Sequence, residues 1–224
     1  MKKFVKKLIV ILIVAASVAA LYGAAVGIGY LVLKGSQPVS DGELSARMGE
    51  LIPAAADVNE MVWGAGLPVD PSADPPLASV TGAQYRPVAR DAACHTVEEL
   101  RSAIAAVYSD VFIREHINFI VFDGDEGAIT EMRPRYAPMK LPGEGDLYYD
   151  WLGIDIMYKG FPLTARIDPA SVRFVRRVPE WNGLWWDSDR IVVSVTETYN
   201  GKTGERELSM RLQDGLWMLD EATY

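Results

Sequence analysis

The sequence predicts an α+β protein: an N-terminal transmembrane helix followed by helices packed on a curved antiparallel sheet. Three observations lead to this fold class. Residues 8–33 carry no charge, residues 44–62 and 96–120 place apolar side chains at helical spacing, and the chain from about residue 129 onward alternates apolar and polar side chains. Because the helical part precedes the strand part, we expect the helices to cover one face of an antiparallel sheet.

The uncharged segment is long enough to cross a membrane. As a helix, Leu8 to Leu33 would measure about 39 Å, against a hydrocarbon core of about 30 Å. Four lysines precede the segment and only Lys34 follows it closely, which predicts a cytoplasmic N-terminus with residues 35–224 outside the cytoplasm. A cleaved signal peptide is the alternative, because alanines at residues 19–25 can supply a cleavage site, but the length favours an uncleaved anchor.

The chain therefore divides into three parts. Residues 1–34 hold the cytoplasmic lysines and the transmembrane anchor, residues 35–41 form a stalk, and residues 42–224 form an extracytoplasmic α+β domain. Within the anchor, Ala19, Gly23 and Gly27 recur every fourth residue. Such a stripe lets two membrane helices approach closely and indicates a homodimer, although membrane helices are rich in small residues in any case.

Charge and cysteine content restrict what the exported part can do. It retains 17 of the 22 Lys+Arg and all 30 Asp+Glu, a formal charge of −13. Such a surface repels nucleic acid and anionic lipid head groups. Cys94 is the only cysteine in the sequence, so no intrachain disulfide can form and the domain must be held by its apolar core.

Two helical regions are expected in the domain. The first extends to Val62, where Gly64 and Gly66 end it, and Pro53 is expected to kink or restart it. Its apolar stripe contains Leu44, Met48, Leu51, Ala55, Val58 and Val62. Residues 67–94 contain five prolines and predict an irregular connection.

The second helical region begins at a capping motif. Thr96 and Glu99 have the spacing of a capping box, in which each side chain bonds to the other residue's backbone amide. Ser109 can cap a further helix, whose apolar face includes Phe112 and His116. The region therefore predicts two short helices or one broken helix.

The rest of the chain predicts strands joined by tight turns. Residues 200–204 and the pair Asp214-Gly215 have the composition of hairpin turns. The expected strands are Ile129–Tyr136, Leu147–Lys159, Leu163–Asp168, Val172–Val178, Arg190–Tyr199, Glu205–Gln213 and Leu216–Asp220.

This layout, with the closing segment DGLWMLD at residues 214–220, resembles the cystatin-like or NTF2-like α+β roll over residues 41–224. A narrower likeness lies in NEMVWGAGLP at residues 59–68, YRPV at residues 85–88, the helix after Thr96 and VYS at residues 107–109. These segments resemble Gram-positive surface proteins related to the IseA-type inhibitors of cell-wall DL-endopeptidases. The resemblance implies a noncatalytic domain that places a loop in the cleft of a wall hydrolase.

Residues 180–189, EWNGLWWDSD, are the main candidate for binding. Asn182-Gly183 is the turn signal in this connection between two strands. Trp185 and Trp186 should point to opposite faces of an extended segment, so we expect one of them beneath the helices and the other exposed together with Trp181.

Acidic residues give weaker candidates. Asp123, Asp125 and Glu126 lie in one turn and can contact a partner or a calcium ion, but they lack the pattern of an EF-hand loop. Asp150 and Asp155 would be the general bases if the roll held a catalytic pocket. Adjacent Cys94 and His95 point in opposite directions in an extended segment, which argues against a catalytic pair, and no metal or cofactor is predicted.

The expected function is therefore that of a membrane-anchored extracytoplasmic module, not an enzyme, that binds or inhibits a cell-envelope protein or binds a wall fragment. A pocket enzyme, either hydrolase or isomerase, is one alternative. A structural subunit of a membrane complex, assembled through the anchor helix, is the other.

Overall fold

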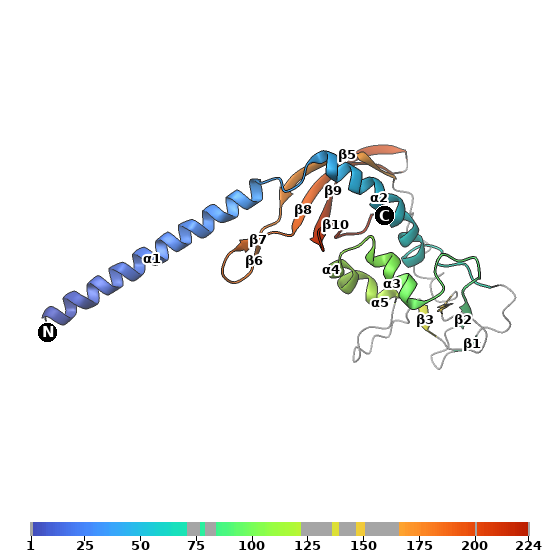
Figure 1. Ribbon diagram of the computed structural model, residues 1–224, viewed down its shortest axis with the longest axis horizontal. Helices are drawn as coiled ribbons and strands as arrows, with labels where there is room; N and C mark the ends of the chain where they lie inside the picture. Colours follow the sequence, from blue (N-terminus) through green and yellow to red (C-terminus); the bar gives the residue numbers. More distant parts are fainter. Residues whose placement is uncertain are drawn as a thin grey trace.

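The computed structural model describes residues 2–70, 77–78, 84–121, 136–138, 147–150, 166–199 and 201–223. These residues form an α+β protein, as predicted, with an apolar N-terminal helix and antiparallel sheets (Figure 1). Figure 1 shows the N-terminal helix extending away from the folded domain, while the C-terminus lies within the domain.

Helix α1 (Lys2–Gly35) is a single uninterrupted helix. Its residues Leu12–Gly35 have a mean hydropathy of 2.0, so this segment is long and apolar enough to cross a membrane. The four partly covered residues of its C-terminal half, Val26, Gly29, Tyr30 and Leu33, are spaced by three and four residues and so lie on one helical face. That face is where the rest of the protein touches α1.

Helix α2 (Asp41–Val62) begins five residues after α1 ends. Ser40 caps it in a capping box with Glu43, and all six residues of the predicted apolar stripe are buried. The expected restart at Pro53 is wrong, because α2 continues through this residue as one helix. Pro53 is exposed, so its ring and its missing hydrogen bond face away from the core, while buried neighbours on the other side hold the helix.

The second helical region is broken, one of the two expected forms. Its capping signals are confirmed: Thr96 and Glu99 form a capping box, and the Ser109 side chain accepts a bond from the amide of Phe112. The elements are α3 (Val97–Ala105), α4 (Asp110–Phe112), the π-helical turn η1 (Ile113–Ile117) and α5 (Asn118–Val121).

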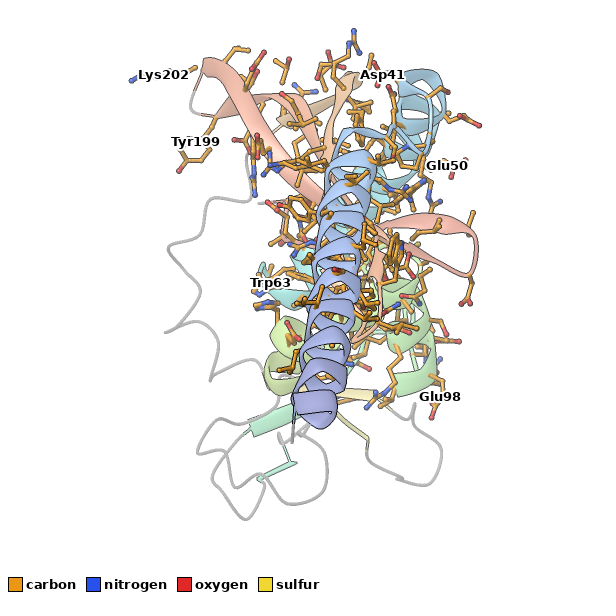
Figure 2. The ribbon with its side chains drawn as sticks, turned by 90° about the vertical axis from the view of Figure 1, so that its left-hand side faces the viewer. Asp41, Glu50, Trp63, Glu98, Tyr199 and Lys202 are labelled. Carbon is orange, nitrogen blue, oxygen red and sulfur yellow. The ribbon has the colours of Figure 1, made fainter. Side chains whose placement is uncertain are left out.

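The main sheet has the strand order β10-β9-β8-β5 and is antiparallel throughout. Helix α2 packs against it, and Figure 2, turned by 90°, shows Asp41 and Trp63 at the two ends of this helix. The predicted alternation is confirmed, because Ile191, Val193 and Val195 are buried on one face of β8. The strands are β5 (Arg166–Arg177), β8 (Arg190–Tyr199), β9 (Lys202–Gln213) and β10 (Leu216–Leu219).

Two boundaries in this sheet differ from those expected. The predicted strands 163–168 and 172–178 form one strand, β5, with an irregularity between Asp168 and Arg173. Ser171 stabilises this bulge, since its hydroxyl donates to Asp168 O and accepts from Thr196 N. The turn at residue 201 is also tighter than expected, because Lys202 already pairs with Tyr199.

A second antiparallel sheet has the order β1-β2-β4-β3. A single curved sheet was expected, so the division of the described strands into two four-stranded sheets and one two-stranded sheet is a correction. The region 67–94, predicted to be irregular, supplies two of these strands, because residues in it pair with β4 and with each other. The strands are β1 (Leu77–Ala78), β2 (Gln84–Pro87), β3 (Tyr136–Pro138) and β4 (Leu147–Asp150). Most of the predicted strand 129–136, residues 151–159 and residues 163–165 lie outside the described residues.

Candidate functional site

The connection between β5 and β8 forms a small hairpin apart from both sheets. Strands β6 (Glu180–Trp181) and β7 (Trp186–Asp187) pair antiparallel, and residues 180–187 are called here the tryptophan hairpin. Asn182 holds its tip: the side-chain oxygen accepts from the amides of Leu184 at 3.0 Å and Trp185 at 2.8 Å. Gly183 has a φ of +96°, a conformation that favours glycine, so the Asn-Gly turn signal is confirmed.

The hairpin packs on helix α1, and Figure 1 shows its loop beside the C-terminal end of that helix. The rings of Trp186 and Tyr30 meet edge to face, with centroids 5.0 Å apart. Gly29 allows the close approach of Trp185, because a Cβ atom at this glycine would lie 2.9 Å from Cζ2 of the indole. Glycine at position 29 therefore lets the backbone of α1 contact the indole ring of Trp185.

A hydrogen bond joins the tip of the hairpin to the same helix. The hydroxyl of Tyr22 donates to the carbonyl oxygen of Leu184 at 2.6 Å. At the base, the guanidinium of Arg177 donates to the hydroxyl of Ser36 at 3.2 Å and to the carbonyl of Ser188 at 3.1 Å. The hairpin is therefore attached to α1 at its tip and its middle, and Arg177 of β5 joins the residue after α1 to the residue after the hairpin.

The three tryptophans lie together, but none is beneath the domain's helices. Trp181 and Trp185 are each 44% exposed, and the tip residue Leu184 is 73% exposed. Trp186 is partly buried between Tyr30 and Trp181, whose ring centroid is 5.2 Å away. The expectation that Trp185 or Trp186 enters the core is wrong, because this hairpin leaves the sheet and meets α1 instead.

Charge is confined to the base of the hairpin. Residues 181–186 carry no ionisable side chain, whereas Glu180 and Asp187 form the pair that closes it. Glu180 lies 3.3 Å from Arg211, which also pairs with Asp189 at 2.8 Å. Burial lowers the pKa of Arg211, but its bonds and attraction to Asp189, Asp220 and Glu180 outweigh this and raise the pKa above the ordinary value.

Beside that base lies a buried polar cluster that sequence reasoning missed. Asp220 is 5% exposed in its side chain and lies between two arginines, with Arg190 Nε at 3.1 Å and Arg211 Nε at 3.4 Å. Its Oδ1 also accepts a hydrogen bond from the hydroxyl of Ser109. Because Ser109 caps α4, the cluster links the second helical region to the end of β10, which is a structural role.

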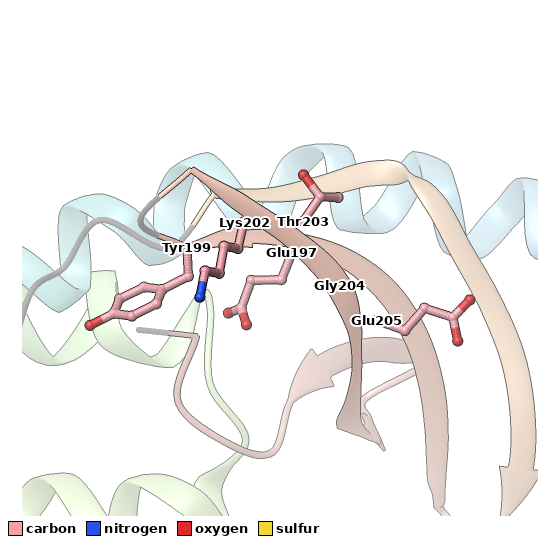
Figure 3. Close-up of a pocket in the computed structure, with 6 residues that line it drawn as sticks. All are labelled: Glu197, Tyr199, Lys202, Thr203, Gly204 and Glu205. Atoms are coloured by element: carbon pink, nitrogen blue, oxygen red, sulfur yellow. The ribbon is translucent and has the colours of Figure 1, made fainter.

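A hollow of about 350 Å³ opens at the far end of the main sheet (Figure 3). Figure 3 shows Tyr199, Lys202 and Glu197 on one side of the β8–β9 hairpin, and Thr203 and Glu205 pointing elsewhere. Glu197 is already paired with Arg206, at 2.8 Å. The hollow can hold a small polar ligand, and its lining includes the ionisable side chains of Glu197, Lys202 and Glu205.

Of the other predicted site residues, the structure describes only Asp150. Asp123, Asp125, Glu126 and Asp155 lie outside the described residues, and Asp150 belongs to β4, where it pairs with Tyr85 of the second sheet. Among the residues that the structure describes, no group of three His, Cys, Asp or Glu side chains is placed to hold a metal ion.

Cys94 and His95 have separate structural surroundings. Cys94 is 3% exposed, and burial, followed by the charge of Glu99, raises the pKa of its thiol. The amide of His95 donates to Glu99 at 2.6 Å, which extends the capping box of α3. A raised pKa reduces the thiolate fraction, the opposite of what nucleophilic catalysis needs.

The partners of the hairpin on α1 were also missed, although the sequence contains a signal for them. Tyr22 and Gly29 are seven residues apart, which places them on one helical face, and Tyr30 adjoins that face. Residues 181–186 of the tryptophan hairpin thus form an uncharged aromatic surface beside an apolar helix, suited to contact with apolar material. No protein-family model matches the sequence, and no curated protein matches it either.

Proposed function

We propose that this protein is a single-pass membrane protein whose domain lies outside the cytoplasm and acts by binding a cell-envelope protein or a wall fragment. The observation that carries the proposal is α1, an apolar helix long enough to span a bilayer and directly attached to the domain. The four lysines at the start of this helix favour a cytoplasmic N-terminus, and the formal charge of −13 beyond it disfavours nucleic acid as the partner.

The filled inner face of the main sheet supports binding over catalysis. The α2 residues Leu44, Met48 and Leu51 are at most 2% exposed, and they belong to the same core as Val193 and Met210 of the sheet. In the described part of the chain, α2 occupies the space where a roll-type enzyme would hold its substrate. Binding through exposed loops and edges therefore fits this domain better.

The relation to the NTF2-like or cystatin-like roll, and the IseA-type inhibition of a wall hydrolase, belong to the same proposal. A helix packed on a four-stranded antiparallel sheet is compatible with such a roll. Inhibition can be tested by titrating the detergent-solubilised full chain into a cell-wall DL-endopeptidase assay. Loss of wall cleavage at stoichiometric amounts would support it, and unaffected cleavage with no binding to envelope extract would exclude it.

The topology can be tested with cysteine labelling in intact cells. In a Cys94→Ser background, Thr203→Cys places a thiol at an exposed position near the start of β9 and Lys3→Cys places one before the anchor. A membrane-impermeant maleimide should label the first variant and not the second. The reverse pattern would contradict the proposed orientation.

The polar hollow supports a second candidate, a hydrolase or isomerase. It brings Glu197, Tyr199 and Lys202 to one opening of about 350 Å³. If a turnover is found, Glu197→Gln should abolish it, and an unchanged rate would remove this hollow from consideration.

A structural role in a membrane complex is the third candidate. An added side chain at Gly23 or Gly27 would contact nothing within 4 Å, so this part of α1 is open to a second helix. Crosslinked dimers should disappear in Gly23→Leu if the stripe mediates assembly.

A further inference from the structure

The contacts between the tryptophan hairpin and α1 follow the helix toward its N-terminus. Trp186, in the returning strand, meets Tyr30, whereas Leu184, at the tip, meets Tyr22. These two helix residues are eight positions apart, or about 12 Å along the axis. The hairpin therefore lies alongside α1, with its tip nearest the middle of the apolar segment.

The depth of these contacts follows from the length of the anchor. A bilayer core needs about 20 helical residues, so counting from Leu8 places its outer boundary near Gly27. Tyr30 is then in the head-group region, and Tyr22 is about 8 Å inside the hydrocarbon. An element bonded to Tyr22 cannot remain in bulk water if α1 spans the membrane.

We propose that the tip of the tryptophan hairpin, residues 181–186, inserts into the outer leaflet beside α1 and makes the bilayer interface its binding partner. The inference rests on the proposed membrane anchoring. In this proposal the three tryptophans contact lipid, so the surface that recognises an envelope partner lies elsewhere on the domain.

The side chains of the tip fit this location. Its exposed apolar residues are Leu184, Trp181 and Trp185, at 73%, 44% and 44%. Tryptophan and tyrosine favour the membrane–water boundary because their rings are apolar and their polar atoms reach the head groups. Lys34 lies 5.9 Å from the Tyr30 ring centroid, which adds the cationic residue common at such boundaries.

The backbone of the tip is also prepared for an environment without water. An unpaired amide or carbonyl is costly in hydrocarbon, so an inserted loop must satisfy these groups internally. The side-chain oxygen of Asn182 accepts hydrogen bonds from the backbone amides of Leu184 and Trp185. The backbone amide of Asn182 donates to the carbonyl oxygen of Trp185 at 3.1 Å. Tyr22 satisfies the carbonyl of Leu184, which is the outermost residue of the turn. An ordinary exposed turn would leave such groups to water.

The charges keep the insertion shallow. Glu180 and Asp187 end the uncharged stretch on either side, and Glu180 pairs with Arg211 of the main sheet. Burying either carboxylate in hydrocarbon would be costly, so the base of the hairpin stays in water. Only the six residues between these acids enter the interface.

The test places an environment-sensitive fluorophore at three sites of the full chain in phosphatidylcholine vesicles. In a Cys94→Ser background, Leu184→Cys reports on the tip, Val18→Cys on the anchor, and Thr203→Cys on an exposed position near the start of β9 in the main sheet. Each thiol carries the dye NBD, and vesicles with brominated acyl chains act as the quencher. Leu184 is highly exposed, so its replacement should leave the fold intact.

We expect blue-shifted, lipid-quenched emission at positions 18 and 184, and aqueous, unquenched emission at position 203. Quenching at 18 with an aqueous signal at 184 would overturn the insertion while leaving the anchor in place, and would free the tryptophans for a protein partner. An aqueous signal at 18 would overturn both proposals. Quenching at all three positions would show a domain lying flat on the bilayer, which also excludes a specific insertion of the hairpin.

A matched pair of glycine variants tests the contact with α1. Gly29→Leu places a side chain where Trp185 sits, whereas Gly23→Leu meets nothing within 4 Å. Lipid quenching at position 184 should fall in the first variant and stay unchanged in the second. Equal quenching in both would overturn the role of α1 in positioning the hairpin. Without any label, quenching of native tryptophan emission by brominated lipid should decrease in Trp185→Phe.

Discussion

At the residue scale, Asp220 shows how a polar group can hold two elements together. It is buried between Arg190 and Arg211 and accepts from the hydroxyl of Ser109. One carboxylate thereby contacts two arginines at the end of the main sheet, and Arg211 also pairs with Asp189 and Glu180. Removing its charge would leave both arginines in place with fewer partners. Removing one member of a buried ion pair destabilises a protein by more than the intact pair stabilises it, because the remaining charge is left uncompensated.

Asp220→Asn should therefore lower the free energy of unfolding by about 2 to 3 kcal/mol. The measurement is urea denaturation of the full chain in detergent micelles. Glu115→Gln is the control, because its ion pair with Arg114 is exposed on both sides and should change stability by less than about 0.5 kcal/mol. Equal effects of the two substitutions would contradict the role given to Asp220.

Three carboxylates predict how stability depends on pH. The pKa values of Glu43, Glu99 and Glu207 are lowered from 4.5, chiefly by bonds from the Ser40 side chain, the His95 amide and the Arg176 guanidinium. A lowered folded-state pKa contributes stability that is present above the ordinary value and is lost as the pH falls through the folded value. The melting temperature should therefore drop on acidification below about pH 4.5.

A variant with glutamine at these three positions should show a smaller drop over the same pH range. Thermal denaturation of both chains followed by circular dichroism makes the comparison. An equal drop in melting temperature with falling pH in both chains would show that the acid sensitivity arises from other groups.

At the element scale, the helix signals of the sequence were accurate where a local bond decides the structure. Thr96 and Ser109, the two caps that were predicted, each cap a helix through their own side chain, a contact that short-range spacing specifies. Strand positions were harder to predict, because bulges and pairing partners depend on distant residues. Asp168 to Arg173 shows this, since the bulge in β5 is fixed by a bond between Ser171 and β8.

Pro53 leads to a prediction for helix α2. Proline inside a helix lacks an amide and its ring collides with the carbonyl four residues earlier, at a cost of about 3 kcal/mol relative to alanine. Pro53→Ala should raise the free energy of unfolding by about 2 kcal/mol, because greater freedom of the unfolded chain offsets part of the gain. Urea denaturation checks this value, and Ala54→Gly, within the same helix, should change it in the opposite direction. A loss of stability in Pro53→Ala would show that proline supports α2.

The tryptophan hairpin illustrates the limit of sequence reasoning about the site. Its turn was predictable from Asn182-Gly183, and the grouping of three tryptophans from the sequence itself. The residues of α1 that the hairpin contacts were not predictable. Trp185 and Gly29 are far apart in the sequence, and no local motif indicates that β7 packs against α1. The seven-residue spacing of Tyr22 and Gly29 places both on one face of α1, but only the position of the hairpin shows that this face is a contact surface.

At the scale of the whole molecule, the separation of an apolar anchor from an acidic domain was predictable from composition alone. The division of the strands among separate sheets was not, since alternating patterns define faces but not strand order. The anchor is also more than a tether, because it covers aromatic surface of the domain through Tyr30 and Gly29.

Removal of residues 1–34 should therefore expose the hairpin and make the domain associate. Trp181, Leu184, Trp185 and Trp186 would form an apolar patch with no cover, a feature that promotes association in water. Analytical ultracentrifugation without detergent should show concentration-dependent oligomers of this fragment. The double variant Leu184→Ser with Trp185→Ser should restore monomers, and a monomeric fragment with the native hairpin would contradict the prediction.

Under the proposed function, the bond between Tyr22 and Leu184 has a consequence for how the domain would meet a target in the same membrane. A domain on a flexible linker samples all directions, whereas one attached at two points loses most of its rotational freedom before any encounter. That loss of entropy is then already met when a partner arrives, so a target in the same membrane plane meets the same face at every collision. The effective concentration of such a target is set by lateral diffusion in the membrane. A binding site held at a different height above the lipid cannot be reached by the domain.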